Sequence, residues 1–313
     1  VYKRQLHDVV AEGAYSQFEL DFHYTNLLEM ADRLVFLRIL LKEIAKKHNM
    51  FITFMPKPTI GDWRSGAHIN FSMVNKNGKN IFDGGNKWSK ESLFAVGGLM
   101  KHAEAITSIT CSTVNSYNGL VPRVGGFEGG TVTWAPTNIT YGHNNRSAQF
   151  RLPQNRYCIE NRAADMTMNV YLAFSMTLSA AVEGIKNKIH PGKPTDQDLY
   201  NMTDREFKKL GIKRLPRNLL MALEALKNDK LSIGKTVGLF AAIIGVIISV
   251  SSSTSSGGLR ASIIGDICAL LGSIGWAYFA FYSKNSRVNS QSPDTLMFLS
   301  LIHISEPTRQ AEI

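Results

Sequence analysis

The chain has 313 residues, and its 35 Lys and Arg against 25 Asp and Glu give a formal net charge of +10 at pH 7. The cations are not gathered into a stripe interleaved with stacking aromatic side chains, so we expect no nucleic-acid partner. The three cysteines have neither metal-ligand spacing nor an even disulfide framework, which indicates a reducing compartment.

Both ends of the chain resemble translated copies of one short sequencing cassette. The first five residues read VYKRQ and the last fifteen read LSLIHISEPTRQAEI, as expected when one cassette is translated from opposite strands. A coincidental basic start and polar tail is the alternative. We therefore predict that residues 1–5 and 299–313 are cloning scars that belong to no fold.

From residue 6 onward, strand and helix patterns alternate. Residues 17–22 alternate acidic or polar with apolar side chains, which predicts a strand with one acidic face. Residues 28–48 carry Leu, Val, Phe and Ile three or four residues apart, the pattern of a long helix. The apolar run at 51–55 predicts a short strand that ends at Pro56.

A second set of elements follows, and its strands again have polar faces. The first of these faces carries His68, Asn70 and Ser72. Residues 90–109 and 168–188 predict helices, and residues 131–135, 146–152 and 157–162 predict strands. In the last strand, the period of two places Cys158, Glu160 and Arg162 on one face. The soluble part is therefore predicted to be an α+β domain.

The composition changes abruptly after residue 229. Residues 237–250 form an apolar run of fourteen, and residues 261–282 form a run long enough to cross a bilayer. The second run ends in aromatic residues followed by Lys284 and Arg287, as at a membrane interface. We predict two transmembrane-like helices within 230–298; buried core helices of a soluble protein are the alternative.

The polar strand faces carry the candidate chemistry. Three carboxylates and one imidazole come from separate strands, a donor set that suits Mg²⁺ or Mn²⁺: Glu12, Glu19, His68 and Glu160. Arg146, Arg151 and Arg162 lie on the neighbouring strands. Divalent metals with several arginines are typical of phosphoryl transfer, which develops negative charge on phosphate oxygens. A solvated strand face, a core histidine and surface arginines are the alternatives.

Several motifs resemble the catalytic domain of glutamine synthetase, in order and over residues 6–229. They include FMPKP (54–58), SGAHIN (65–70), NSY (115–117), NNRSAQFRLP (144–153), IENR (159–162) and GIKNKIHPG (184–192). The resemblance implies a curved, mostly antiparallel sheet with backing helices. It also implies a cytoplasmic, homo-oligomeric ligase that uses ATP and Mg²⁺ or Mn²⁺ to phosphorylate the γ-carboxylate of glutamate, after which ammonia displaces the phosphate.

The resemblance assigns roles residue by residue. Glu12 and Glu19 match the ligands of one metal, and His68 and Glu160 match ligands of the other. Gly66 matches the glutamate-binding turn. The remaining matches are Arg146 and Arg162 for glutamate and the transferring phosphoryl group, Arg151, Asn70 and Ser72 beside the nucleotide, and Glu128 as the flap acid that deprotonates the incoming ammonium.

Three departures from the family pattern bear on the substrate. Arg64 stands where the family usually has Gly, and Asn118-Gly119 where it commonly has Lys-Arg, so an arginine for the substrate carboxylate is missing. Arg64 or Arg123 could restore that charge. The stretch GGFEGGTVTWAPT is closer to γ-glutamyl-amine ligases, so ammonia and a small amine both stay open.

Tyr200 falls where some relatives carry a regulatory tyrosine; ordinary packing is the alternative.

The resemblance also predicts an incomplete enzyme. The family's N-terminal β-grasp domain and a strand with two further glutamates have no counterpart, so we expect this fragment to be inactive by itself. Residues 230–298 resemble the middle of an EamA-type transporter of small metabolites, which suggests a chimera of two genes. A transporter fragment, or a genuine fusion that tethers the ligase to a membrane, are the other functional classes.

Overall fold

The computed structural model describes residues 6–121, 123–124, 131–132 and 134–229. These all belong to the first of two compact units, residues 1–242 and 243–313. The predictions for the cassette-like ends, for Glu128 and for the transporter-like segment 230–298 therefore lie outside the described residues. Within the described part, no helix combines the length and apolarity that a membrane span requires.

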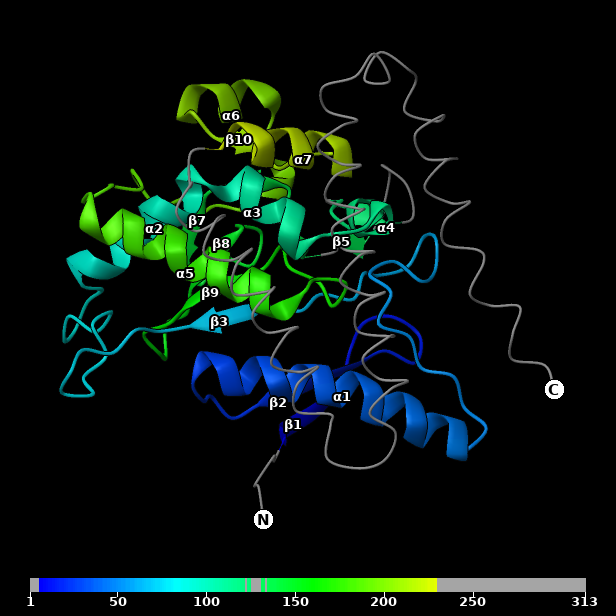
Figure 1. Ribbon diagram of the computed structural model, residues 1–313. Coiled ribbons are helices and arrows are strands. Elements are labelled where there is room, and N and C mark those ends of the chain that lie inside the picture. Colours follow the sequence, from blue (N-terminus) through cyan, green and yellow to red (C-terminus); the bar gives the residue numbers. More distant parts are fainter. Residues whose placement is uncertain (1–5, 122, 125–130, 133, 230–313) are drawn as a thin grey trace, which may run out of the picture. The chain divides into compact units, whose positions relative to one another are not determined.

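The described chain alternates short strands with helices (Figure 1). The strands are β1 (Leu6–Ala11), β2 (Phe18–Phe22), β3 (Ile69–Phe71), β4 (Arg123–Val124), β5 (Thr131–Val132), β6 (Asn138–Ile139), β7 (Tyr141–His143), β8 (Phe150–Leu152), β9 (Ile159–Asn161) and β10 (Lys213–Arg214). The helices are α1 (Leu27–Lys47), α2 (Lys90–Lys101), α3 (Ala103–Thr110), α4 (Val114–Asn118), α5 (Val170–Lys186), α6 (Asp204–Leu210) and α7 (Leu219–Asn228).

The largest sheet has four strands in the order β3-β9-β8-β7. The β3–β9 and β8–β9 pairs are antiparallel and the β7–β8 pair is parallel, in keeping with the predicted mostly antiparallel sheet. The hairpin of β1 and β2 forms a separate two-stranded sheet. Among the described residues, the hairpin that carries Glu19 therefore does not pair with the strands of the main sheet.

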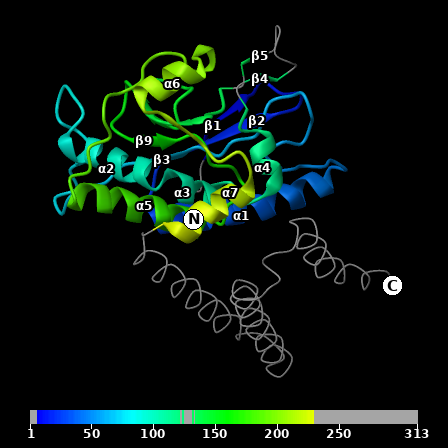
Figure 2. The same cartoon turned by 90° about the horizontal axis from the view of Figure 1, so that it is seen from above.

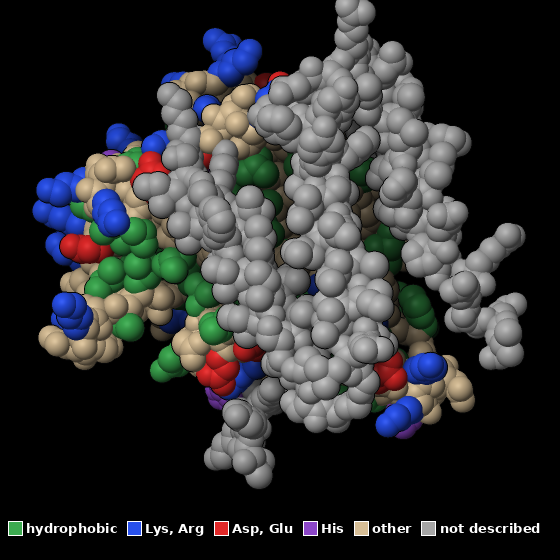
Figure 3. Space-filling view, viewed as in Figure 1, with side chains coloured by type: hydrophobic (Ala, Val, Ile, Leu, Met, Phe, Trp, Pro, Cys, Tyr) green, Lys and Arg blue, Asp and Glu red, His purple; other side chains and the backbone are tan. Residues whose placement is uncertain are grey.

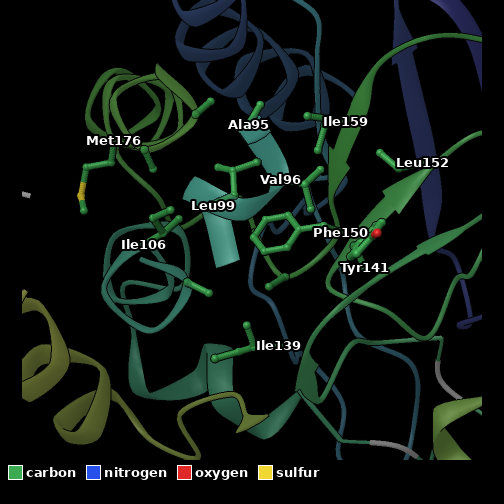
Figure 4. Close-up of a cluster of buried hydrophobic side chains, with 14 of the residues drawn as sticks. Ala95, Val96, Leu99, Ile106, Ile139, Tyr141, Phe150, Leu152, Ile159 and Met176 are labelled. Atoms are coloured by element: carbon green, nitrogen blue, oxygen red, sulfur yellow. The ribbon is translucent and has the colours of Figure 1, made fainter. Parts of the chain in front are cut away.

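Helices cover one side of the strands. Figure 2 shows α2, α3 and α5 along one side of the main sheet, whereas β1 and β2 lie away from these helices. The side chain of Phe150 in β8 packs against Val96 and Leu99 of α2 in the core cluster (Figure 4). Because side chains alternate along a strand, Arg151 next to Phe150 faces the opposite, open side.

Small residues let the two central helices approach closely. A Cβ atom added at Gly98 of α2 would lie 2.0 Å from the carbonyl oxygen of Ala180 in α5, and one at Gly184 would lie 2.1 Å from that of Phe94. Both positions must therefore be glycine for steric reasons. The close α2–α5 crossing fixes the helical layer that supports β8 and β9.

Most predicted helices are confirmed, with one division. Residues 28–48 correspond to α1, which Asn26 caps by accepting the backbone N–H of Glu29. The helix predicted over 90–109 is two helices, α2 and α3, that meet at His102. The His102 side chain bonds the carboxylates of Asp229 and Glu183, and its backbone departs from helical geometry.

Two strand predictions need correction. Residues 51–55 form no strand; Phe51 is exposed, and the segment leads into backbone hydrogen bonds between Lys57 and the side chain of Asn115. Glu12 was placed on a strand without predicted bounds, but β1 ends at Ala11, so Glu12 lies just after the strand. The sequence of β1, LHDVVA, lacks strict alternation, and only its pairing with β2 makes it a strand.

Candidate active site

Three polar side chains form a row across the open face of the main sheet. Asn70 of β3 lies opposite Glu160 of β9, and Glu160 lies opposite Arg151 of β8. Directly opposite residues on neighbouring strands share a face of the sheet. The next strand, β7, places Gly142 opposite Arg151, so the row ends beside a position without a side chain.

Glu160 is the electrostatic centre of this row. Its side chain is only 4% exposed, and its Oε2 accepts from Nη1 of Arg151 at 2.9 Å while Oε1 accepts from Nη1 of Arg162 at 2.7 Å. Burial by itself would raise the pKa of Glu160, but the hydrogen bond from His68 and the positive charges of the two arginines hold that pKa well below its usual range. Glu160 is therefore an anion at neutral pH.

His68 uses one ring nitrogen to contact Glu160. Its Nδ1 lies 3.2 Å from Oε1 of Glu160, and because a carboxylate only accepts, Nδ1 carries the proton. Desolvation lowers the pKa of His68, against the opposing effect of the Glu160 hydrogen bond. A neutral ring with Nδ1 protonated leaves the lone pair of Nε2 free, and Nε2 lies beside Gly66.

Arg162 is held from three sides. Besides Glu160, its Nε donates to the carbonyl of Arg146 at 2.9 Å and its Nη2 donates to the carbonyl of Trp134 at 3.2 Å. The side chain of Arg146 itself is exposed. Arg146 thus contributes its backbone to the placement of Arg162 and leaves its guanidinium at the surface, where it could meet an anion.

The hairpin of β1 and β2 carries a second group of acids. Glu12 follows β1, and Glu19 lies in β2 opposite Val10. Burial, the hydrogen bond to Glu12 and the negative charges of Asp21, Glu12 and Glu160 raise the pKa of Glu19 to about 7. The charge of Glu160 contributes to this shift in pKa, so the hairpin acids and Glu160 lie near enough to interact electrostatically.

The four predicted metal ligands occur as two pairs, Glu12 with Glu19 and His68 with Glu160. In the described residues, no three His, Cys, Asp or Glu side chains lie close enough to hold one metal ion. The crowded Glu12–Glu19 pair and the free Nε2 of His68 fit a divalent cation, which would relieve the repulsion between the carboxylates. Glu160 differs from Glu12 and Glu19, because its charge is already neutralised by Arg151 and Arg162. The four-ligand assignment stays a prediction.

The predicted nucleotide residues lie around the row. Arg151 also donates to the side chain of Asn144, and Asn70 accepts from Nη2 of Arg156 at 3.2 Å. Ser72 is exposed just after β3, and Gly66 is exposed two residues before His68. The roles of these residues toward a nucleotide or glutamate stay predictions.

Sequence reasoning missed the backbone turn that holds Arg162. Trp134 has a φ of 53°, a left-handed conformation that a bulky residue rarely adopts. The adjacent carbonyl, of Ala135, accepts from the hydroxyl of Tyr200 at 2.7 Å, and the Trp134 and Tyr200 rings meet edge to face. Burial raises the pKa of Tyr200. In this structure the Tyr200 hydroxyl is used in packing, through its hydrogen bond to Ala135. Regulatory modification of Tyr200 stays untested.

Arg64, one of the two residues expected to restore a missing charge, faces inward. Its side chain is 5% exposed and pairs with Asp165 at 3.4 Å. It is therefore not presented to a substrate carboxylate. The side chain of the other candidate, Arg123, lies outside what the structure describes.

The chain belongs to the glutamine synthetase family, whose catalytic domain matches residues 3–239. A glutamine synthetase from Microchaete diplosiphon is 42% identical over 235 residues, which is 72% of this chain and 46% of that protein. One from Pyrococcus horikoshii is 40% identical over 222 residues, or 70% and 48%. A GmaS structure in complex with ADP has a TM-score of 0.68 and 31% identity, and the match covers 82% of this chain and 58% of that chain.

These matches bear on the predicted boundaries. The chain spans about half the length of the curated relatives it matches. The family match begins inside the cassette-like segment 1–5 and continues ten residues past the predicted boundary at 229. None of these matches supports the transporter-like interpretation of residues 230–298, which stays untested.

Proposed function

We propose that this chain is the catalytic portion of an ATP-dependent ligase that joins glutamate to ammonia or a small amine through a γ-glutamyl phosphate. The observation that carries the proposal is the buried Glu160, which orients Arg151 and Arg162 on the open face of the sheet. Two guanidinium groups share one carboxylate, so the row keeps positive charge for phosphate oxygens.

The proposed reaction has two steps. An oxygen of the γ-carboxylate attacks the γ-phosphorus of ATP, and ADP leaves with the electron pair of the broken P–O bond. The amine nitrogen then attacks the acyl carbon, inorganic phosphate leaves, and the nitrogen loses one proton. We assign the proton acceptor to Glu128 from the family resemblance, with Arg146 and Arg162 neutralising the phosphoryl group and glutamate.

Divalent metal chemistry fits the donor set in part. Glu12, Glu19 and His68, with Glu160, would hold Mg²⁺ or Mn²⁺, and the bound ions would neutralise phosphate charge. The chain's own contribution is orientation: His68 is fixed through Nδ1 by Glu160, which leaves Nε2 available. A ligand held from its second nitrogen loses little freedom on binding metal.

Ammonia and an amine remain alternatives within the same chemistry. The curated relatives at 40–42% identity are named glutamine synthetase, which favours ammonia. The similarity to GmaS and the glycine-rich segment around Glu128 favour the amine-ligase branch. The GmaS structure in complex with ADP also supports a nucleotide site in this chain.

Ligand binding is the deciding test, because the match covers only part of the longer relatives. We expect the full chain to bind ADP in a Mn²⁺-dependent manner, measured by calorimetry, and Glu160→Ala to weaken binding at least about tenfold by releasing both arginines. Glu224→Ala, at an exposed position on α7, is the control. Equal binding by the native chain and Glu160→Ala would refute the assigned site.

Turnover then decides the acceptor. Phosphate release from ATP is measured with glutamate, Mg²⁺ or Mn²⁺, and either ammonia or methylamine. We expect no release above the Glu160→Ala background from this chain by itself; release above it would show a working ligase, and the faster nitrogen donor would identify the branch.

A further inference from the structure

Arg64 is a buried arginine with an incomplete set of partners. Its Nη2 lies 3.1 Å from the carbonyl oxygen of Ala163, and 3.4 Å from both the carbonyl oxygen of Ala164 and Oδ2 of Asp165. Its Nε has no hydrogen-bond partner in the described part of the chain. A buried guanidinium is costly to desolvate, so the contacts of Arg64 with neighbouring segments must offset that cost.

Gly119 provides the space that Arg64 occupies. A Cβ atom at residue 119 would lie 2.7 Å from Cβ of Arg64 and 3.3 Å from its Nε. The φ of Gly119 is −96°, which any residue can adopt, so the requirement for glycine here is steric. Arg64 and Gly119 therefore fit together as a pair.

The loop that begins near Arg64 connects the two groups of predicted ligands. On one side, the side chain of Gln17 in the hairpin turn donates to the carbonyl of Arg64 at 2.9 Å and to Oγ of Ser65 at 3.3 Å. The ring of Trp63 packs over Gly13 of the same turn. Residues 63–68, here called loop 63–68, therefore contact the turn between Glu12 and Glu19.

On its other side, the loop is fastened to the segment after β9. The N–H of Ala67 donates to the carbonyl of Ala164 at 2.9 Å, and Arg64 bonds the carbonyls of Ala163 and Ala164. The loop ends at His68, which contacts Glu160. Arg64 therefore lies in the loop that contacts the hairpin turn on one side and the segment after β9 on the other, and that leads to His68.

We propose that Arg64 is a positioning residue, which ties loop 63–68 to residues 163–165 and thereby sets the placement of the Glu12–Glu19 pair relative to the His68–Glu160 pair. The metal-binding consequence rests on the proposed function; the mechanical role does not. The buried charge is directed at Asp165 and two carbonyls, so Arg64 acts through the loop and contacts no substrate.

Hydrogen exchange of the full chain tests the mechanical role. In Arg64→Met, we expect amide exchange in peptides from 12–19 and 63–68 to rise at least about tenfold, with α5 unchanged. Arg33→Met is the matched control: among the described residues, Arg33 is also largely buried, its Nε has no hydrogen-bond partner, and it forms an ion pair with Glu29. Unchanged exchange in both peptides, or an equal rise throughout α5, would overturn the proposal.

A double-mutant cycle of Arg64 and Gly119 distinguishes loss of their contact from general misfolding. Gly119→Ala should reproduce the exchange increase when Arg64 is present, because the added methyl group displaces Arg64. The same change should have little effect in an Arg64→Gly background, where the facing Cβ is gone. Equal effects of Gly119→Ala in the two backgrounds would show that the residues are not coupled.

Mn²⁺ affinity of the full chain tests the functional consequence. Loss of a residue that orients metal ligands typically weakens affinity about 10- to 100-fold, so Arg64→Met should do so, Arg64→Lys should recover part of the loss, and Arg33→Met should change nothing. Native affinity in Arg64→Met would refute the link to metal binding. If the native chain binds no Mn²⁺, the proposed function fails, while the exchange result still decides the role of Arg64.

Discussion

At the scale of single residues, Glu160 shows how one buried carboxylate organises several cations. Its two oxygens are shared among Arg151, Arg162 and His68. A buried ion pair is not in itself strongly stabilising, but removal of one partner leaves the other charges buried and uncompensated. The open face therefore depends on Glu160 more than on any one arginine.

The first prediction concerns Glu160→Gln. We expect the free energy of unfolding at pH 7 to fall by about 3 kcal/mol, the usual cost of breaking a buried ion pair. The folded chain lowers the pKa of Glu160 from 4.5, so its contribution is present above pH 4.5 and is lost as the pH falls below it. The difference between native and variant chains in urea unfolding should therefore shrink below pH 4.5.

The exposed Glu224→Gln on α7 serves as the control and should change little at either pH. A difference between native and Glu160→Gln chains that stays constant from pH 7 to pH 3 would contradict the ionised state assigned to Glu160.

The second prediction is that Glu19→Gln stabilises the chain at high pH, whereas Glu160→Gln destabilises it. The folded chain raises the pKa of Glu19 to about 7, so the associated stability is present below pH 4.5 and is lost as the pH rises through 7. In metal-free buffer at pH 8, Glu19→Gln should raise the Tm measured by circular dichroism, with little effect at pH 5. Glu43→Gln, at an exposed site on α1, is the comparison. A lower Tm at pH 8 would show that Glu19 is not electrostatically crowded.

At the scale of elements, local pattern predicted the helices better than the strands. The three- and four-residue spacing of Leu, Val, Phe and Ile predicted α1 correctly. The buried residues of the helix are Ala31 and Ala45, whereas Phe36 and Ile39 are exposed in the described structure. By contrast, the apolar run at 51–55 pairs with no strand of the described structure, and β1 is defined by its partner β2. Strand identity depends on distant pairing, which a single segment of sequence does not reveal.

The second element-scale feature is the glycine contact between α2 and α5. Gly98→Ala would normally favour a helix by about 0.5–1 kcal/mol. Here the added methyl group would collide with the Ala180 carbonyl, so we expect a net loss of about 1–3 kcal/mol in unfolding free energy. Lys186→Ala, exposed at the end of α5, is the control. Stabilisation by Gly98→Ala, measured in urea, would contradict the close crossing.

At the scale of the whole molecule, sequence pattern predicted which strand residues share a polar face, but not which contacts hold their side chains. Period-two alternation correctly placed Asn70 and Glu160 on polar strand faces. The left-handed turn at Trp134 and the burial of Arg64 were not predictable, because both depend on contacts between segments far apart in the chain. The separation of the Glu12–Glu19 hairpin from the main sheet has the same cause.

The final prediction concerns which part of the chain folds by itself. The largest described core cluster consists of buried residues between Phe82 and Leu215, and α7 adds the buried Ala222 beside Cys111 and Tyr117. A chain of residues 6–239 should therefore keep the native amide protection of α2 and α5. One that ends at residue 217 should lose much of it, because it lacks both α7 and the bond from Asp229 to His102.

Hydrogen exchange followed by mass spectrometry compares the two shortened chains with the full chain. Loss of protection in residues 6–239 would mean that later residues are needed for the fold, contrary to the predicted boundary near 229. Retention of full protection by the chain that ends at 217 would mean that α7 and the His102–Asp229 contact are dispensable. The expected order of stability follows from burial: each apolar side chain removed with α7 exposes the surface that it covered on α3, at about 25 cal/mol per Å².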